Sequence, residues 1–568
     1  MDRVQLIAIA LGIGLLVYWF MTVSPQQAPQ PETSVTQQNE PRPPPHAPGM
    51  PTLAPMTQAE TASLAPPAVS LETFDTVTLE NDAVRMEIST RGARLSSVQL
   101  KHYRSALDEN SGPLELVTVP ERGTLVAFLG EGVFARLENE KYEVVRVEPR
   151  EAELRVVRDG IEVRRVLTLD ESGYGARLRV SVENHSDVRV RPAFQLVWYG
   201  QDNSHSTTER FQAYSLVAME DEGVERTPLQ GTSSPLSCAG GGGEPKGREL
   251  ARPVEWAGID SRYFMAVAIA EAPGEASAYQ GPIGRHAGQS VLSYPPFEVP
   301  PGAHVERNYR LYLGPKIRSD VVAVEPRLEP ALRVGWVWVR PLVELFVGML
   351  RWTYEHVIAN YGVSIIILTF LVRLGTFPLT QRSMKSMQSV SVVAPEMKLL
   401  QEKHKDDKAK LQQEMMALYR RKGINPLTAM GGGCLLMLIQ MPFLLALYFA
   451  LQSSIELRHA PFILWIHDLS VPEDFFSIAG LPIRPLPLLM GLSMVLQQRL
   501  MPTPNVDPQQ RQMMMFMSVF FIFLFYSFAS GLVLYWFVSN LLAIGQQVLL
   551  RRKTAAAETA KTKKDPKG

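Results

Sequence analysis

A single arginine stands inside an apolar segment of the chain. The stretch IIILTFLVRLGTFPLT, within residues 361–380, contains Arg373 and no other charged residue. A guanidinium at the centre of a membrane-spanning helix costs about 3 kcal/mol on insertion scales. On a helix, Thr369, Arg373 and Thr376 share one face about 60° wide. Thr380 extends this stripe by one more turn, so the pattern predicts a polar, positively charged stripe opposite a face of Ile, Leu and Phe.

The other apolar segments supply candidate neighbours for this arginine. The last segment carries two polar arcs about 100° apart, with Tyr535, Ser539 and Gln546 on one and Trp536, Asn540 and Gln547 on the other. Further polar residues in these segments are Gln440, Ser493, Gln497, Ser518 and Tyr526. No segment offers an obvious carboxylate at matching depth, and a buried arginine without an ionic partner needs water or many neutral acceptors. We therefore predict a wet cavity, open toward the cytoplasm and lined by these side chains.

An alternative interpretation gives the stripe no function. The Arg373 side chain reaches about 6 Å and could extend to the inner lipid headgroups. The threonines could instead bond to their own helix backbone.

The bulk composition hides two unlike halves. The 568 residues carry a formal net charge of +0, a balance that implies no nucleic-acid partner. Residues from about 70 to 330 are charged and strand-like, whereas residues from about 335 to 550 are dominated by apolar side chains. The two cysteines, Cys238 and Cys434, fall in different halves, so a disulfide framework is not expected. The sequence also shows no cluster of metal ligands, and we expect neither a metal nor a cofactor.

The first half predicts an anchored β domain. Residues 1–23 are long and apolar enough to span a bilayer, and a cleaved signal peptide is the competing interpretation. Residues 24–70 are rich in Pro and Gln and predict an extended linker. Residues 71–330 alternate with period two between turn signals, which predicts a large antiparallel, sandwich-like β domain. Residues 332–352 predict an amphipathic helix at the membrane interface, kinked or starting at Pro341, with a buried helix of the β domain as the alternative.

The second half predicts a multi-pass membrane protein. Five apolar segments cover residues 361–380, 427–452, 485–500, 513–529 and 531–550, so the expected total with the anchor is six membrane-spanning helices. Lys and Arg number ten in 381–424, seven after Leu550 and two in 453–484. By the positive-inside rule, the predicted helical hairpin of 381–426, the basic tail of 551–568 and both termini are cytoplasmic. The β domain is then outside, in the periplasm of a Gram-negative bacterium.

A one-sided wet cavity favours a polypeptide guest. A channel must open at both faces of the membrane, and the chain shows neither the repeated halves nor the paired broken helices typical of transporters. A positive groove at half depth would shorten the hydrocarbon path for hydrophilic segments that must cross the bilayer. Apolar parts of the guest could leave sideways into lipid.

Four stretches resemble the YidC membrane protein insertase family in its Gram-negative form. They are IIILTFLVRLGTFPLT, QEMMALYRRKGINPLTAMGGGCLLMLIQMPFLLALYFAL, ELRHAPFILWIHDLS and SGLVLYWFVSNLLAIGQQ. The resemblance covers about 335 to 550. It implies a five-helix insertase core with a groove open to cytoplasm and lipid, and a periplasmic β-supersandwich domain. It implies insertion of nascent membrane proteins, alone or beside the Sec translocon, with the hairpin receiving substrate or ribosome.

The resemblance also implies roles for particular residues. Arg373 matches the groove arginine of the family, and Thr369 and Trp536 match positions that meet the passing substrate. The expected groove residues are Arg373, Thr369, Thr376, Gln440, Tyr535, Trp536, Ser539 and Asn540. This chain has Trp536 where family members carry a second tyrosine, which puts a specific hydroxyl role at that position in doubt.

Three other functions compete with insertion. A small-molecule transporter would need a second intramembrane charge. A membrane-anchored carbohydrate enzyme would need a paired acid and base, for which the outer half offers His185, His205 and His304 only as isolated histidines. A scaffold or accessory subunit of the Sec machinery, without insertion of its own, is the main alternative. We expect no enzymatic activity, no small-molecule substrate, and contact with membrane lipids.

Overall fold

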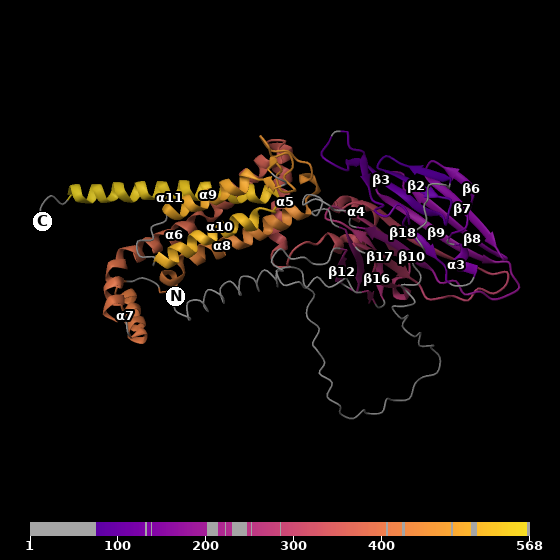
Figure 1. Cartoon of the computed structure of the whole chain (residues 1–568), viewed down its shortest axis with the longest axis horizontal. Coiled ribbons are helices and arrows are strands. Elements are labelled where there is room, and N and C mark those ends of the chain that lie inside the picture. Colours follow the sequence, from indigo (N-terminus) through magenta and orange to yellow (C-terminus); the bar gives the residue numbers. More distant parts are fainter. Residues whose placement is uncertain are drawn as a thin grey trace, which may run out of the picture. The chain divides into compact units, whose positions relative to one another are not determined.

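The computed structural model describes residues 75–564, with gaps at 109, 131–132, 138, 202–213, 222, 230–246, 251–252, 285, 405–406, 423–425, 479–480 and 501–507 (Figure 1). The predicted anchor of 1–23 and linker of 24–70, together with Cys238 and His205, lie outside the described residues.

Residues Thr76 to Pro315 form antiparallel sheets because apolar and polar side chains alternate along their strands. In β9 (Gly175–Asn184), for example, Leu178, Val180 and Val182 are buried while the residues between them face outward. The largest sheet has nine strands in the order β12 (Gly223–Pro228), β11 (Ser215–Glu220), β14 (Val254–Asp260), β15 (Phe264–Ala270), β18 (His304–Pro315), β9, β8 (Ile161–Leu169), β7 (Glu151–Arg158) and β6 (Glu143–Glu148).

Two smaller sheets pack with the nine-stranded sheet around a shared core. One has the order β1 (Thr76–Glu80), β2 (Val84–Ser89), β3 (Arg94–Arg104) and β4 (Pro113–Glu115). The other has the order β13 (Arg248–Leu250), β16 (Ser277–Gly284), β17 (Ala287–Ser293), β10 (Gln195–Gln201) and β5 (Val126–Phe128). Trp198, Trp256 and Tyr312 are fully buried in this core. The outer half is therefore β-rich, as predicted, and the finer supersandwich assignment stays a prediction.

A buried ionic cluster adds polar contacts to the β domain. Asp260 at the end of β14 accepts hydrogen bonds from Lys316 Nζ at 2.6 Å and Arg226 Nε at 2.9 Å. Burial acts to raise the pKa of Asp260, but the two cations outweigh it and hold that pKa below its ordinary value. Removing one partner would leave an uncompensated buried charge.

Short helices link the β domain to the apolar half. They are α4 (Arg318–Val324) and the 3-10 helix η3 (Pro326–Leu332), whereas α3 (Val133–Leu137) lies between β5 and β6 within the β domain. The predicted interfacial helix is shorter at its start than expected: α5 spans Arg340–His356, with Pro341 in its first turn. Residues 333–339 are not helical, because a proline is readily accommodated in the first turn of a helix but not in its interior.

The apolar half is helical. Its long helices are α6 (Tyr361–Lys403), α7 (Lys408–Arg421), α8 (Pro426–Ser453), α9 (Pro485–Leu500), α10 (Pro508–Phe525) and α11 (Ser530–Lys564) (Figure 1). A 3-10 turn, η4 (Ile455–Leu457), and a two-stranded hairpin of β19 (Phe476–Ile478) and β20 (Leu481–Ile483) lie between α8 and α9. Helices α6 and α8 pack on each other, α11 packs on α6 and α9, and α9 packs on α10.

The helices differ in extent from the predicted segments. Helix α6 continues without a break from the first apolar segment into the predicted hairpin and ends at Lys403, just before the expected polar break at 404–407. Helix α11 continues to Lys564 and so includes most of the basic tail. Two described helical stretches, Tyr361–Pro378 and Ser530–Leu549, are long and apolar enough to cross a membrane, and Met515–Phe525 is a shorter apolar stretch. The total of six spans stays a prediction.

Candidate functional site

Arg373 is held by a neutral hydroxyl on another helix. Its Nε and Nη2 atoms donate to Ser539 Oγ of α11 at 3.0 and 2.7 Å. Arg373 lies twelve residues after the start of α6, about 18 Å along the helix axis. Because the guanidinium reaches across to α11, the structure does not place it along its own helix toward the inner end, as the snorkelling alternative would require.

Two further side chains complete what we call the polar cluster: Arg373, Gln440, Tyr535 and Ser539. Gln440 of α8 donates from Nε2 to Ser539 Oγ at 3.0 Å and to Tyr535 Oη at 3.3 Å. Tyr535 is fully buried and Ser539 nearly so, whereas Arg373 and Gln440 are half-buried. Three helices, α6, α8 and α11, thus contribute polar groups to one point.

The sequence sets the orientation of α6 and α11 in this cluster. The face of α6 opposite the stripe is apolar and exposed, and consists of Phe370, Leu371, Leu374 and Phe377. The start of α11 is fixed because Ser530 Oγ donates to the carbonyl oxygens of Asp468 and Val471 at 2.7 and 3.0 Å. With the start of α11 fixed, Tyr535 and Ser539 point inward one turn apart.

The threonines of the stripe bond to their own helix. Thr369 donates to the Ile365 carbonyl at 2.6 Å, Thr376 to that of Val372 at 2.9 Å, and Thr380 to that of Thr376 at 2.9 Å. Threonine hydroxyls commonly bond in this way within a helix. This part of the alternative interpretation is therefore correct. Among the described residues, Arg373 is the member of the stripe that forms a hydrogen bond with another helix.

Trp536 and Asn540 face a different part of the bundle. The ring of Trp536 lies 4.9 Å from that of Phe525 and 5.6 Å from that of Phe521, both on α10. Asn540 donates from Nδ2 to Ser493 Oγ of α9 at 3.0 Å. The two polar faces of α11 therefore contact different helices. Tyr535 and Ser539 contact α6 and α8, whereas Trp536 and Asn540 contact α9 and α10. The structure does not bring these last two residues to Arg373.

Neutral side chains surround the positive charge of Arg373 in the polar cluster. Within the part of the chain that the structure describes, Arg373 forms no ion pair, and its hydrogen-bond acceptor is a serine. Further along α11, Gln547 is 4% exposed, and neither polar atom of its amide has a hydrogen-bond partner among the residues that the structure describes. A buried cation on a neutral acceptor and an unpaired amide both favour an additional polar ligand, water or peptide. The cluster can therefore bind polar groups, but it holds no nucleophile and base paired for catalysis.

A buried carboxylate lies in the loop between α8 and α9, and no pattern in the sequence pointed to it. Glu473 is 5 % exposed and accepts from Trp465 Nε1 at 2.5 Å and from the backbone N–H of Leu486 at the start of α9. Arg484 donates from Nε to the Glu473 carbonyl at 3.1 Å. Burial raises the pKa of Glu473. The single carboxylate thus ties the loop to α9, a structural role.

Comparisons with known proteins match nearly the whole chain. The family model described as 60Kd inner membrane protein matches residues 352–558, and the one described as YidC periplasmic domain matches residues 76–345. The membrane protein insertase YidC of Pelobacter propionicus is 32% identical over 97% of this chain and 99% of its own length. That of Syntrophus aciditrophicus is 31% identical over 97% of this chain and 100% of its own length.

Two solved structures show a weak likeness to this chain. An active YidC insertase crystal structure with its first transmembrane domain resolved covers 83% of this chain and 93% of its own, with 16% identity and a TM-score of 0.34. A galactose mutarotase-like protein from Lactobacillus casei covers 42% of this chain and 100% of its own, with 12% identity and a TM-score of 0.32. The sequence relatives decide the assignment: this chain belongs to the YidC family of membrane protein insertases.

Proposed function

We propose that this chain inserts integral membrane proteins into the lipid bilayer and helps them fold. Its curated relatives share the name membrane protein insertase, and they match it along nearly their entire length. In our proposal, hydrophilic segments of the guest pass along a groove open to cytoplasm and lipid, while its apolar segments leave sideways. The process involves no bond-making chemistry and no cofactor.

The observation that carries the proposal is the bonding of Arg373. Its guanidinium is held by a neutral serine hydroxyl, at 2.7 Å from Nη2. The remaining N–H groups of the guanidinium are available to carbonyl or carboxylate oxygens of a passing polypeptide. A positive, hydrogen-bonding position at half depth in the membrane lowers the cost of carrying polar backbone and acidic side chains through hydrocarbon. In this proposal Gln440, Tyr535 and Ser539 line the path beside Arg373, whereas Trp536 and Asn540 support the helix contacts of α11 with α9 and α10.

The proposed placement has six membrane-spanning helices, cytoplasmic termini and a periplasmic β domain in the bacterial inner membrane. The family description as an inner membrane protein and the matched periplasmic domain support the location. The ten basic residues of 381–424 support the orientation. The exposed apolar residues of α5, Leu345 and Trp352, suit a helix at the membrane interface.

The proposed partners are nascent membrane proteins, the Sec translocon and the ribosome. The basic, exposed end of α7 and the basic sequence of the last turns of α11 suit ribosomal RNA or anionic lipid. The hairpin of α6 and α7 has its own small apolar core of Val393, Leu418 and Tyr419, which gives a partner a defined surface to meet.

Site-specific photocrosslinking tests the proposed path. A photoreactive amino acid at Gln440, in the polar cluster, is compared with one at Phe523, which is 78% exposed on α10. We expect Gln440 to crosslink to the hydrophilic flank of a ribosome-stalled, single-span nascent chain, and Phe523 to crosslink to lipid. Equal crosslinking of that flank from both positions would contradict a path along the cluster.

The second candidate function is a scaffold of the Sec machinery that does not insert proteins itself. It is favoured by the large β domain, which suits binding to a partner. Liposomes containing only this protein distinguish the two, because an insertase integrates a single-span substrate without Sec proteins or nucleotide. Integration no greater than in empty liposomes, with the protein shown to be folded, would favour the scaffold.

A further inference from the structure

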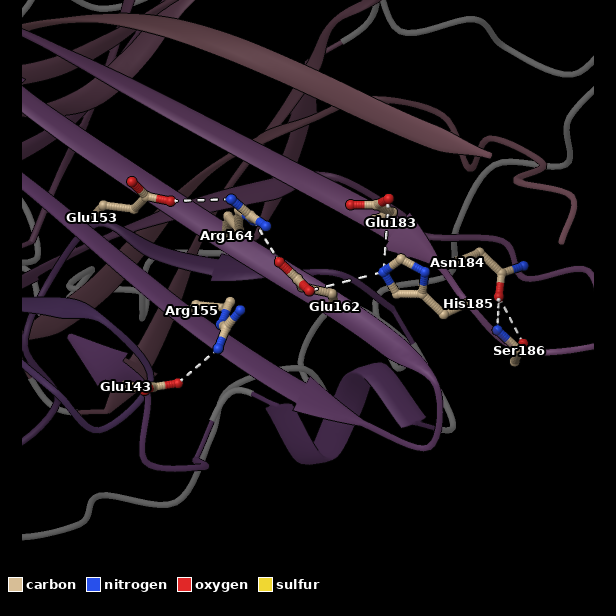
Figure 2. Close-up of polar contacts among 9 residues, drawn as sticks. All are labelled: Glu143, Glu153, Arg155, Glu162, Arg164, Glu183, Asn184, His185 and Ser186. Carbon is tan, nitrogen blue, oxygen red and sulfur yellow. Dashed lines mark hydrogen bonds and ion pairs between the residues drawn. The ribbon is translucent and has the colours of Figure 1, made fainter. Parts of the chain in front are cut away.

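Three potential metal ligands meet on the outer face of the nine-stranded sheet. Figure 2 shows the His185 ring between the carboxylates of Glu162 and Glu183. His185 Nε2 lies 3.8 Å from Glu162 Oε2 and 3.7 Å from Glu183 Oε1. One ligand atom from each of the three residues lies within 4.8 Å of the others. This arrangement has no place in membrane insertion as described above.

The sheet register accounts for the meeting of the two carboxylates. Glu162 of β8 pairs directly with Glu183 of β9, so both side chains stand on the same face. Like charges directly opposite each other destabilise a sheet unless a cation lies between or beside them. The next strand, β18, places His304 opposite Glu183, and this exposed residue adds a second imidazole to the same row.

The histidine is held in place by a rigid turn. The backbone N–H of His185 donates to the Gly160 carbonyl at 2.7 Å. The Asn184 side chain donates to the carbonyls of Val188 and Val299 at 2.8 and 3.0 Å and accepts from Ser186. Gly160 has a φ of +74°, and a Cβ there would lie 3.1 Å from Ser186, so the two turns pack closely. Such preorganisation lowers the entropic cost of binding a ligand.

The surroundings of Glu162 suit a metal ligand. Its side chain is 10% exposed, while those of Glu183 and His185 are 43% and 48% exposed. One ligand is therefore buried, and the other two leave the site accessible to an ion from solvent. Arg164 donates to Oε1 of Glu162 and leaves Oε2 facing the histidine. A hydrogen bond to the second oxygen orients a ligating carboxylate. Arg164 also lies 3.4 Å from Glu153 Oε1, which offsets its positive charge.

The donor set identifies the class of ion. One imidazole nitrogen and two carboxylate oxygens suit Zn²⁺ and related divalent transition metals rather than Mg²⁺ or Ca²⁺, which prefer oxygen ligands alone. Tetrahedral Zn²⁺ at about 2.1 Å from each ligand separates neighbouring ligand atoms by about 3.4 Å. The 3.7 and 3.8 Å from His185 Nε2 to the carboxylates need only a slight closing, and the two carboxylate oxygens lie within 4.8 Å of each other, so a shift of the exposed Glu183 side chain completes the site. We propose that Glu162, Glu183 and His185 form a binding site for a divalent transition metal ion of the Zn²⁺ class.

The test measures Zn²⁺ binding to the full chain in detergent micelles at neutral pH by titration calorimetry. Cys238→Ser and Cys434→Ser are included in every variant to remove thiol ligands. His185→Ala and Glu183→Gln change two of the exposed ligands, and His286→Asn changes an exposed histidine of the same domain outside the cluster. His286 has a φ of 61°, a conformation that asparagine accepts.

We expect the background chain and His286→Asn to bind one more equivalent of Zn²⁺ than either ligand variant, or to bind it about tenfold more tightly. Without metal, none of the variants should unfold at a lower temperature than the background chain, since the changed side chains are exposed and Glu183→Gln removes a like charge opposite Glu162. Equal stoichiometry and affinity in all four would overturn the proposal and leave His185 as the ionic partner of two carboxylates. Equally tight binding of Mg²⁺ at this site would also overturn the assignment.

Discussion

At the scale of single residues, the bond between Arg373 and Ser539 is the contact that defines the site. Hydrogen bonds to charged groups contribute about 1.5–3 kcal/mol, against about 1 kcal/mol for neutral pairs. Ser539 accepts from a guanidinium, whereas the equally buried Ser493 accepts from the amide of Asn540. We therefore expect Ser539→Ala to lower the free energy of unfolding more than Ser493→Ala, measured by chemical denaturation in micelles. The reverse order would show that the serine does not support the arginine.

The expected departure from the family pattern at position 536 leads to a second residue-scale prediction. The contacts of Trp536 with Phe521 and Phe525 are ring contacts, so an aromatic ring is what the position requires. Trp536→Tyr should keep most of the insertion activity of the wild type, while Trp536→Ala should lose a large part of it. Insertion rates into vesicles measure both. A tyrosine variant as impaired as the alanine variant would instead indicate a specific role for the indole.

The sequence predicts the identity of the site residues better than their partners. The 4-3-4 spacing places Arg373 in a polar stripe, and the absence of a nearby carboxylate among the apolar segments correctly directs attention to neutral acceptors. Which acceptor it meets depends on how α11 is rotated against α6, and that is set by tertiary contacts such as those of Ser530. For the same reason, the separation of Trp536 and Asn540 from Arg373 is not visible in the sequence.

At the scale of elements, small residues control how closely the helices approach. A Cβ at Gly491 of α9 would lie 2.1 Å from Ile522 Cγ1 of α10, whereas one at Gly545 of α11 would meet nothing within 4 Å. Gly491→Ala should therefore lower the unfolding temperature, because overpacking costs about 1–3 kcal/mol. Gly545→Ala should leave it equal or raise it, since alanine favours a helix by up to about 1 kcal/mol. Equal effects in differential scanning calorimetry would contradict the close contact of α9 and α10.

Periodicity predicts elements well where one face is buried. The period-two pattern of the outer half corresponds to antiparallel strands, and the polar break after Lys403 corresponds to the end of α6. It does not predict strand register, and register alone places Glu162 opposite Glu183. Helix ends are predicted unevenly: Pro341 marks the start of α5 at Arg340, whereas the extension of α11 to Lys564 was not expected.

At the scale of the whole molecule, the uneven distribution of Lys and Arg predicts the orientation in the membrane. The test uses a chain in which Cys238 and Cys434 are replaced by serine. Gln413→Cys then introduces one exposed thiol on α7, and Glu271→Cys introduces one on the surface of the β domain. A membrane-impermeant maleimide added to spheroplasts should modify Glu271→Cys only. After the membrane is disrupted, the maleimide should also modify the thiol of Gln413→Cys. Modification of both positions in intact spheroplasts would contradict cytoplasmic placement of the hairpin.

The measurement that tests the central claim most directly is insertion of a small single-span protein into liposomes that contain only this chain. Wild type, Arg373→Lys and Arg373→Ala are compared without nucleotide or Sec proteins, after confirming equal folding. The account predicts that lysine, which keeps the charge, retains most of the activity, whereas alanine lowers the insertion rate about tenfold, equivalent to ~1.4 kcal/mol. Equal insertion by all three proteins would contradict a role for the Arg373 charge in the path of the inserted protein.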